Sequence, residues 1–213
     1  MLLAELVGQT ERDDFAVRQL QITETAQFYG LNATNSLLLG GTALARYGLN
    51  TYLSDLPGNT PFDVDAILLV PPEQRLGLSA RLRDLRFEPI IELRRREAPL
   101  HLTLFRGTAA QKIATRYLGY ASYEAMVADR VVLGDLATIP LDKLLTAKLS
   151  SSSLKDAAGV IKAYAIVRAE GRDAAYGPVL RTHAENALSI LTARKMARQV
   201  AAYTGWLQDL LPR

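Results

Sequence analysis

Asp63 and Asp65 are the two residues of this sequence whose types and spacing most directly suggest chemistry. They stand at the start of an apolar run, and because side chains alternate along a strand, both carboxylates point to the same face. Two such carboxylates repel each other unless a cation lies between them, and pairs of this kind hold magnesium for in-line attack on phosphorus. The alternative is a pair of solvated acids at the start of an edge strand.

A second motif, Gly40-Gly41-Thr42, separates a short apolar run from a segment of good helix formers. A glycine turn before a helix exposes backbone N–H groups that can hold phosphate oxygens, and Thr42 adds a hydroxyl at the expected N-cap. Neither a Walker lysine nor the spaced glycines of a dinucleotide fingerprint accompany it. We predict a phosphate-binding turn, and the alternative is a plain tight turn.

Lys148 stands where the pattern of its segment calls for an apolar side chain. A buried ammonium needs an anionic partner, which a nucleoside triphosphate or the Asp63–Asp65 pair could supply. Alternatively, the stem packs and the charged head reaches water. The helical stripe that includes this lysine consists of Leu141, Leu144, Leu145, Lys148 and Leu149.

Asp156 ends the sequence Ser153-Leu-Lys-Asp156, a capping-box pattern at the expected start of a helix. The pattern leaves a structural role for Asp156 open beside a functional one. Serines 150–153, just before it, provide either a flexible joint or additional phosphate ligands.

The elements that must position these residues change in kind along the chain. The first part reads as a mixed α/β fold and the last part as helices, so we expect an α+β protein with a mixed sheet flanked by helices and a C-terminal helical bundle. We place the boundary near residue 138, giving an α/β domain over 1–138 and a helical region over 139–213 packed on it. We predict strands at 36–39, 63–70, 87–93 and 100–105. We predict helices at 11–29, 42–47, 72–86, 155–170, 178–195 and 195–211, and a further helix that begins near residue 140.

The amino-acid composition of the chain excludes several classes of protein and of metal site. The chain has 213 residues, 49% of them hydrophobic, which suits an ordinary globular protein. No apolar run is long enough to span a membrane and the N-terminal segment lacks the pattern of a signal peptide, so we expect a cytoplasmic protein with no membrane partner. The absence of cysteine excludes disulfides and thiolate chemistry, and a count of two histidines disfavours a His-rich metal site. A metal here would be a hard ion held by carboxylates.

Basic residues are concentrated in residues 81–116, which hold nine lysines and arginines against four acids, although the whole chain carries only +3. An excess of this kind can contact a nucleotide triphosphate or a nucleic acid. The alternative is a solvated basic surface. Further basic residues near the C-terminus are Arg181, Arg194, Lys195 and Arg198.

Taken together, these motifs resemble the nucleotidyltransferase fold of the polymerase β type, in particular the bacterial abortive-infection toxin-like nucleotidyltransferases. The matching pieces are Leu37-Leu-Leu-Gly-Gly-Thr-Ala-Leu44, Phe62-Asp-Val-Asp-Ala-Ile67, Leu144-Leu-Thr-Ala-Lys-Leu149 and Lys155-Asp156. The resemblance covers roughly residues 35–165. It implies that Asp63 and Asp65 bind Mg²⁺, that Gly40, Gly41, Thr42 and Lys148 bind the nucleotide, and that Lys148 and Asp156 complete the catalytic set.

The sequence departs from the family pattern in two places. A third carboxylate belongs on the strand next to the Asp-x-Asp strand, but the stretch His101-Leu-Thr-Leu-Phe105 has none, and His101 and Thr103 occupy the face where it would lie. In addition, Asn59-Thr60-Pro61-Phe62 replaces the usual Arg and Ser/Thr before the Asp-x-Asp motif. The first departure affects either activation of the attacking hydroxyl or activity itself, and the second implies rearranged nucleotide contacts.

The resemblance implies a Mg²⁺-dependent enzyme that moves a nucleoside monophosphate from an NTP to an acceptor hydroxyl. The basic residues favour RNA as the acceptor, such as the 3′ end of tRNA. Such a protein would be the toxin of a toxin–antitoxin pair, with an antitoxin protein as partner. Two alternatives remain: a module with a degraded site that binds nucleotide or a partner protein without chemistry, and an enzyme that nucleotidylates a drug hydroxyl, which the basic stretch disfavours.

Overall fold

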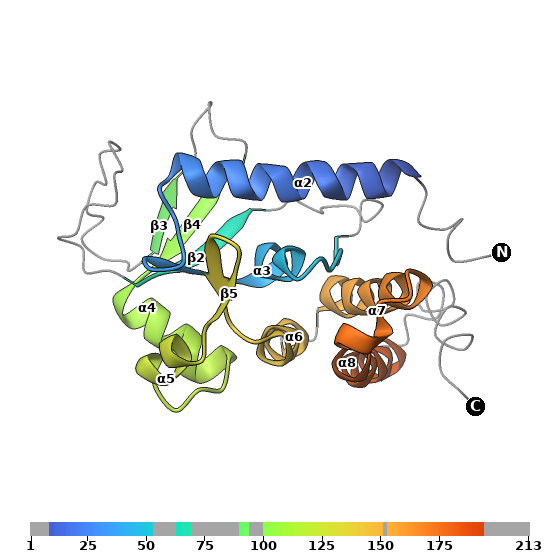
Figure 1. The fold of residues 1–213 in the computed structure, drawn as a ribbon. Helices are drawn as coiled ribbons and strands as arrows, with labels where there is room; N and C mark the ends of the chain where they lie inside the picture. The colour runs from blue at the N-terminus through green and yellow to red at the C-terminus, as the bar shows by residue number, and fades with distance from the viewer. Residues whose placement is uncertain (1–8, 53–62, 70–89, 94–99, 151–152, 194–213) are drawn as a thin grey trace. The chain divides into compact units, whose positions relative to one another are not determined.

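The computed structural model of the 213-residue chain describes residues 9–52, 63–69, 90–93, 100–150 and 153–193. Predicted elements at 72–86 and 195–211, and the segment before Asp63, lie outside these ranges. The described residues form helices and a mixed sheet (Figure 1), which confirms the α+β class.

The chain divides into two compact units. One, here called the sheet unit, contains Val17–Tyr47 and Thr60–Leu144, and the other, here called the helical unit, contains Met1–Ala16, Gly48–Asn59 and Leu145–Arg213. Along the chain, the last change from the sheet unit to the helical unit falls between residues 144 and 145, a few residues after the boundary expected near 138. The helical unit also includes two segments from the first third of the chain, so the division is not a single cut.

A six-stranded mixed sheet forms the core of the sheet unit, in the order β3-β4-β2-β1-β6-β5. Apolar residues on both faces of the sheet are buried; Leu37, Ile67 and Leu104 each have an exposed fraction of 0%. Strand β2 pairs antiparallel with β1 and parallel with β4. The strands are β1 Ser36–Leu38, β2 Val64–Leu68, β3 Ile90–Leu93, β4 Leu102–Phe105, β5 Val131–Leu133 and β6 Leu136–Thr138.

Helix α2, Gln9–Phe28, begins in the segment assigned to the helical unit and continues into the sheet unit. It ends before Gly30, whose φ of 68° only glycine adopts readily, as the sequence predicts. Helix α3, Gly40–Arg46, follows β1 directly. In the view of Figure 1, α2 lies above the strands, and α4 and α5 lie next to each other below them.

Residues 106–137, for which the sequence pattern predicts no element, form α4 Gly107–Lys112, a π-helical turn Ile113–Tyr117, α5 Tyr123–Ala128 and the β5–β6 hairpin. These elements are short and carry little periodicity, which is why the pattern misses them. Arg46 connects this hairpin to the rest of the unit, because its guanidinium donates to the carbonyl of Leu133 and to the hydroxyl of Thr23.

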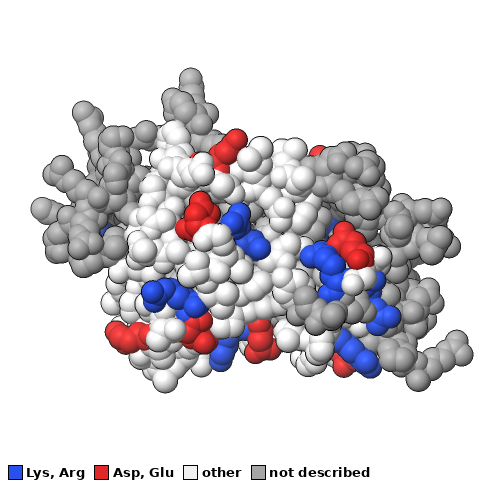
Figure 2. Space-filling view, in the orientation of Figure 1, with Lys and Arg blue, Asp and Glu red and all other residues white. Residues whose placement is uncertain are grey.

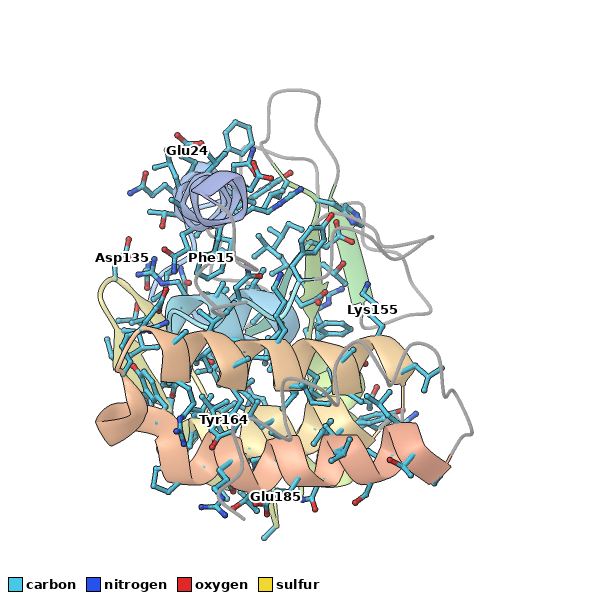
Figure 3. The ribbon with its side chains drawn as sticks, turned by 90° about the vertical axis from the view of Figure 1, so that its right-hand side faces the viewer. Phe15, Glu24, Asp135, Lys155, Tyr164 and Glu185 are labelled. Atoms are coloured by element: carbon cyan, nitrogen blue, oxygen red, sulfur yellow. The ribbon has the colours of Figure 1, made fainter. Side chains whose placement is uncertain are left out.

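The described helices of the helical unit are α7, Leu154–Ala169, and α8, Asp173–Ala193, which pack along each other (Figure 3). Helix α6, Leu141–Ser150, crosses the division between the units. Residues 157–167 of α7 are all buried. We expect a helix to begin at 178 after Gly177, but α8 begins at Asp173 and continues through both Gly177 and Pro178. The proline removes one backbone donor, and packing against α7 outweighs that loss.

No helix in the described ranges is long and apolar enough to cross a membrane.

Candidate functional site

Asp63 and Asp65 lie at the start of β2, as the sequence predicts. Asp63 immediately precedes the strand and Asp65 is its second residue. Val64 and Ala66, which alternate with them, are fully buried, whereas both aspartates are partly exposed. The period of two therefore puts the carboxylates on the face opposite to Val64 and Ala66.

Asp65 is in an environment that disfavours its ionised form. Burial raises the pKa of Asp65 to about 6 from 3.8, the charge of Asp63 raises it further, and His101 opposes the shift. In the described part of the chain, no lysine or arginine forms an ion pair with either aspartate. The site concentrates negative charge that the described side chains do not neutralise, and a divalent cation would stabilise both carboxylates.

The first glycine of the diglycine motif lies against Asp65. The backbone N–H of Leu39 donates to the carbonyl of Asp65 at 2.8 Å, which brings the start of α3 beside β2. Gly40 has a φ of 60°, and a Cβ there would lie 3.3 Å from Oδ2 of Asp65. A side chain at residue 40 would thus be strained and would crowd the carboxylate, so glycine keeps the space next to Asp65 open.

Thr42 is placed differently from the prediction. The N-cap of α3 is Leu39 and the helix begins at Gly40, so Thr42 is its third residue. Thr42 is fully buried, and its hydroxyl donates to the carbonyl of Leu39 at 2.7 Å. The prediction that the Thr42 hydroxyl binds phosphate is therefore wrong for this structure, because the buried hydroxyl is used to stabilise the turn. Of the motif, the backbone of Gly40 and Gly41 is left to contact a phosphate group.

The strand next to β2 carries no acid at the positions that face Asp63 and Asp65. Strand β4 runs parallel to β2 with Asp65 opposite Thr103. The backbone N–H of Val64 donates to the carbonyl of His101 at 2.7 Å, and Nδ1 of His101 lies 3.7 Å from Oδ1 of Asp63. The register thus places a hydroxyl and an imidazole beside the two carboxylates.

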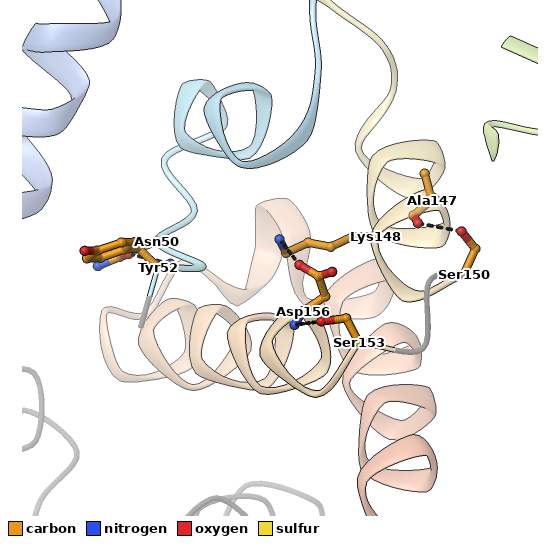
Figure 4. A network of polar contacts seen from close by, with 7 residues as sticks. All are labelled: Asn50, Tyr52, Ala147, Lys148, Ser150, Ser153 and Asp156. Atoms are coloured by element: carbon orange, nitrogen blue, oxygen red, sulfur yellow. Dashed lines mark hydrogen bonds and ion pairs between the residues drawn. The ribbon is translucent and has the colours of Figure 1, made fainter. Parts of the chain in front are cut away.

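Lys148 and Asp156 lie in the helical unit, where the structure brings them together (Figure 4). The ammonium of Lys148 donates to Oδ1 of Asp156 at 2.7 Å, and the two side chains are only 15% and 25% exposed. The anionic partner that a buried lysine requires is therefore present within the chain. Ser153 caps α7 by accepting from the N–H of Asp156, which confirms the expected helix start.

Lys162 is a buried charged residue that the sequence-based predictions missed. It is 5% exposed on α7, and its ammonium donates to the backbone carbonyl of Tyr52 at 2.7 Å. Burial lowers the pKa of Lys162 to about 8. The available signal was a lysine inside the almost continuous apolar run of residues 157–167.

The residues at β2 fit a hard divalent cation such as Mg²⁺. Two carboxylate groups supply oxygen ligands, and Gly40 leaves room beside one of them. Within the described ranges, no three His, Cys, Asp or Glu side chains gather closely enough to hold a metal by themselves. A cation at Asp63 and Asp65 would therefore take its remaining ligands from substrate phosphates and water.

The basic residues do not form one patch on the face drawn in Figure 2, where positive and negative side chains are interspersed. Of the nine basic residues in 81–116, the structure describes Arg106, Lys112 and Arg116. The predicted basic surface at 81–86 and 94–96 lies outside the described residues.

Comparisons with protein-family models, curated proteins and solved structures found no match to this chain. The function is therefore argued from the motifs and from the geometry of the site.

Proposed function

We propose that the protein is a Mg²⁺-dependent nucleotidyltransferase whose metal site is Asp63 and Asp65. The observation that carries the proposal is the partly buried Asp65 carboxylate, which lies beside a second carboxylate and against the open space at Gly40. Structural carboxylates are usually paired when buried. A pair without a lysine or arginine partner in the described residues favours a site that binds a cation.

The residues of the sheet unit have distinct tasks in this proposal. Asp63 and Asp65 would hold Mg²⁺, which when bound neutralises phosphate charge at the reacting centre. The backbone of Gly40 and Gly41 would orient the β- and γ-phosphates, and Thr42 would hold that turn in shape through its bond to Leu39. Orientation of this kind contributes much of the rate enhancement in phosphoryl-transfer enzymes.

The reaction is an in-line displacement. The oxygen of an acceptor hydroxyl forms a bond to the α-phosphorus of the NTP while the bond from that phosphorus to the bridging β-phosphate oxygen breaks. Pyrophosphate leaves with the electron pair, and the hydroxyl proton passes to water. RNA, such as the 3′ end of tRNA, is the proposed acceptor, and a toxin paired with an antitoxin protein is the proposed biological role; both rest on the resemblance and on the basic stretch of the sequence.

Lys148 and Asp156 have a narrower proposed role. The ion pair neutralises Lys148 in the helical unit, so the lysine would contribute to triphosphate binding only by exchanging Asp156 for a phosphate group. The resemblance supports Lys148 as a nucleotide ligand and Asp156 as the residue that holds it.

The direct test incubates the protein with each labelled NTP, Mg²⁺ and total tRNA. We expect label on RNA with the unchanged protein and a loss of about 10²–10³-fold with Asp63→Ala, the scale of removing one preorganised group that stabilises transition-state charge. Glu124→Gln, which removes an exposed acid of α5 in the same unit, is the matched control and should retain transfer. Transfer that survives Asp63→Ala contradicts the assignment.

A module that binds nucleotide without chemistry is the second candidate, and the Thr103 position favours it. The register places a hydroxyl where a third acid would lie opposite Asp65. The two candidates separate in one experiment, because the module would bind Mg²⁺–NTP in an Asp63-dependent way and move no label to RNA or to itself.

A further inference from the structure

Three side chains on the segment that follows β4 are exposed to solvent, and we call them the α4 face. Lys112 ends α4, and Arg116 and Tyr117 belong to the π-helical turn that continues it. All three are exposed, and Tyr117 has an exposed fraction of 55%. The buried side of the same segment consists of Ala110, Ala114 and Leu118. A π-helical turn is rare and often marks a functional site.

Tyr117 differs from the two tyrosines that follow it at intervals of three residues. The hydroxyl of Tyr120 donates to Asp129 at 2.7 Å, and the hydroxyl of Tyr123 donates to the carbonyl of Leu68 at 3.3 Å. Within the described ranges, the side chain of Tyr117 forms no hydrogen bond or ring contact. The fold uses two of these three tyrosines, and the ring of the third is open to a ligand.

Lys112 and Arg116 are cations that the described residues leave unneutralised. Neither side chain forms a hydrogen bond, an ion pair or a cation–π contact with a described residue. The sequence has no aspartate or glutamate between Glu97 and Glu124. The other described lysines and arginines of the sheet unit each have such a contact; they are Arg18, Arg46, Arg106, Arg130 and Lys143. Positive charge therefore remains on the α4 face for an anionic ligand.

Two cations beside an exposed aromatic ring suit single-stranded RNA. Residues four apart on a helix have about 5–6 Å between their Cβ atoms, so Lys112 and Arg116 can each reach a different phosphate of one strand. The ring of Tyr117 offers a surface for an unstacked base, which a single strand supplies and a duplex does not. A protein partner would instead need an apolar centre. The other exposed side chains of this segment are polar, namely Thr108, Gln111 and Thr115.

We propose that the α4 face binds the body of a single-stranded RNA whose end is the acceptor at Asp63 and Asp65. The inference rests on the proposed function, because that function makes RNA the acceptor. Strand β4 runs parallel to β2 and leads from His101, beside Asp63, to the start of α4, a length of about 15–20 Å. The bound RNA must therefore extend several nucleotides from its reacting end.

The test measures RNA binding to the full chain without NTP, by fluorescence anisotropy of a labelled 15-nucleotide single strand at several salt concentrations. The double variant Lys112→Ala, Arg116→Ala should weaken binding and lower the slope of log K against log salt by about 1.4, because each phosphate contact contributes about 0.7. Tyr117→Ala should weaken binding about 5- to 150-fold at an unchanged slope, and Tyr117→Phe should retain it. Arg130→Ala removes an exposed arginine after α5 and is the matched control, with unchanged binding expected.

The outcomes separate the inference from the proposed function. RNA affinity that is the same in the double variant and in Tyr117→Ala as in the unchanged protein would overturn the inference, and label transfer to RNA would still support the function. RNA binding that depends on the α4 face, without label transfer, would contradict the function alone. Asp63→Ala should lose transfer and keep RNA binding. Equal competition by polyglutamate or by phosphatidylserine vesicles, insensitive to Tyr117→Ala, would assign the face to another anionic partner and overturn the inference.

Discussion

Asp65 in the sheet unit and Asp156 in the helical unit are both largely buried carboxylates, and they differ in what surrounds them. Asp156 accepts a hydrogen bond from the ammonium of Lys148 at 2.7 Å. Asp65 lies beside a second carboxylate, and burial raises its pKa to about 6. The helical unit neutralises this buried charge within the chain, whereas no described lysine or arginine pairs with Asp65 in the sheet unit.

The difference separates residues that stabilise the fold from residues that are available for chemistry. A paired carboxylate contributes to stability and loses some of it when the partner is removed. A carboxylate held beside a like charge costs stability until a cation binds. Substitutions at the two places should therefore change the free energy of unfolding in opposite directions.

The largest expected stability effect is at Asp65. The folded protein holds a proton there between about pH 4 and pH 6 that the unfolded chain has already lost, so the free energy of unfolding falls as the pH rises through this window. The pKa shift of Asp65 corresponds to a decrease of up to about 3 kcal/mol in the free energy of unfolding across this window. Urea denaturation at a series of pH values should show this slope in the unchanged protein and lose it in Asp65→Asn. Saturating Mg²⁺ should restore stability above pH 6 in the unchanged protein alone; equal slopes in both proteins would contradict the comparison.

In the helical unit, Gly159→Ala should destabilise the fold by about 2–3 kcal/mol. A Cβ at residue 159 would come within van der Waals overlap of the Thr51 carbonyl oxygen, which belongs to the backbone and cannot turn away. Thermal unfolding measures the loss. Gly171→Ala is the control, because Gly171 has a φ of 68° in open space and should cost only about 1 kcal/mol. Neither change should alter Mg²⁺–NTP affinity, and an altered affinity would show that the two regions are not separate in function.

Breaking the ion pair should cost less. Lys148→Met and Asp156→Asn are each expected to destabilise the protein by about 1–2 kcal/mol, because each leaves a partly buried charge without this partner. A double-mutant cycle by urea denaturation gives the coupling energy. If Lys148 also contacts the triphosphate, Lys148→Met weakens NTP binding and Asp156→Asn does not. Identical affinities in the two variants would confine the pair to a structural role.

The smallest effect is expected at Thr42. Thr42→Val removes the hydroxyl that donates to the Leu39 carbonyl and should cost about 1 kcal/mol. NTP affinity should change less than about two-fold, because the hydroxyl is buried, and Thr42→Ser should retain both properties. Isothermal titration with Mg²⁺–NTP measures the affinity; a ten-fold loss in Thr42→Val would make the hydroxyl a phosphate ligand after all.

Much of the fold could be predicted because its main elements have strong local signals. The branched residues of β2, the glycine stop after α2 and the Ser153 cap of α7 are each set by a few neighbouring residues. The short elements between residues 106 and 137 have no such signal. The course of α8 through Pro178 also escapes prediction, because it depends on packing against a distant helix.

The candidate site shows the same limit. The spacing of Asp63 and Asp65 predicts that they share a face, and the structure confirms it. The partner of Lys148 and the contact of Lys162 with Tyr52 depend on tertiary structure, so the sequence gives the need for a partner but not its identity. The same holds for Thr42, whose position within α3 depends on where the helix begins.

The contacts of residues 48–52 within the helical unit have a consequence for synthesis on the ribosome. Two later residues hold the ends of the segment 48–52. The ammonium of Lys162, on α7, donates to the carbonyl of Tyr52, and the guanidinium of Arg172, just after α7, donates to the carbonyl of Gly48. Tyr52 is thus synthesised well before its partner Lys162, at a sequence separation of 110. A nascent chain that stops before α7 lacks those partners, so residues 48–52 gain them only late in translation.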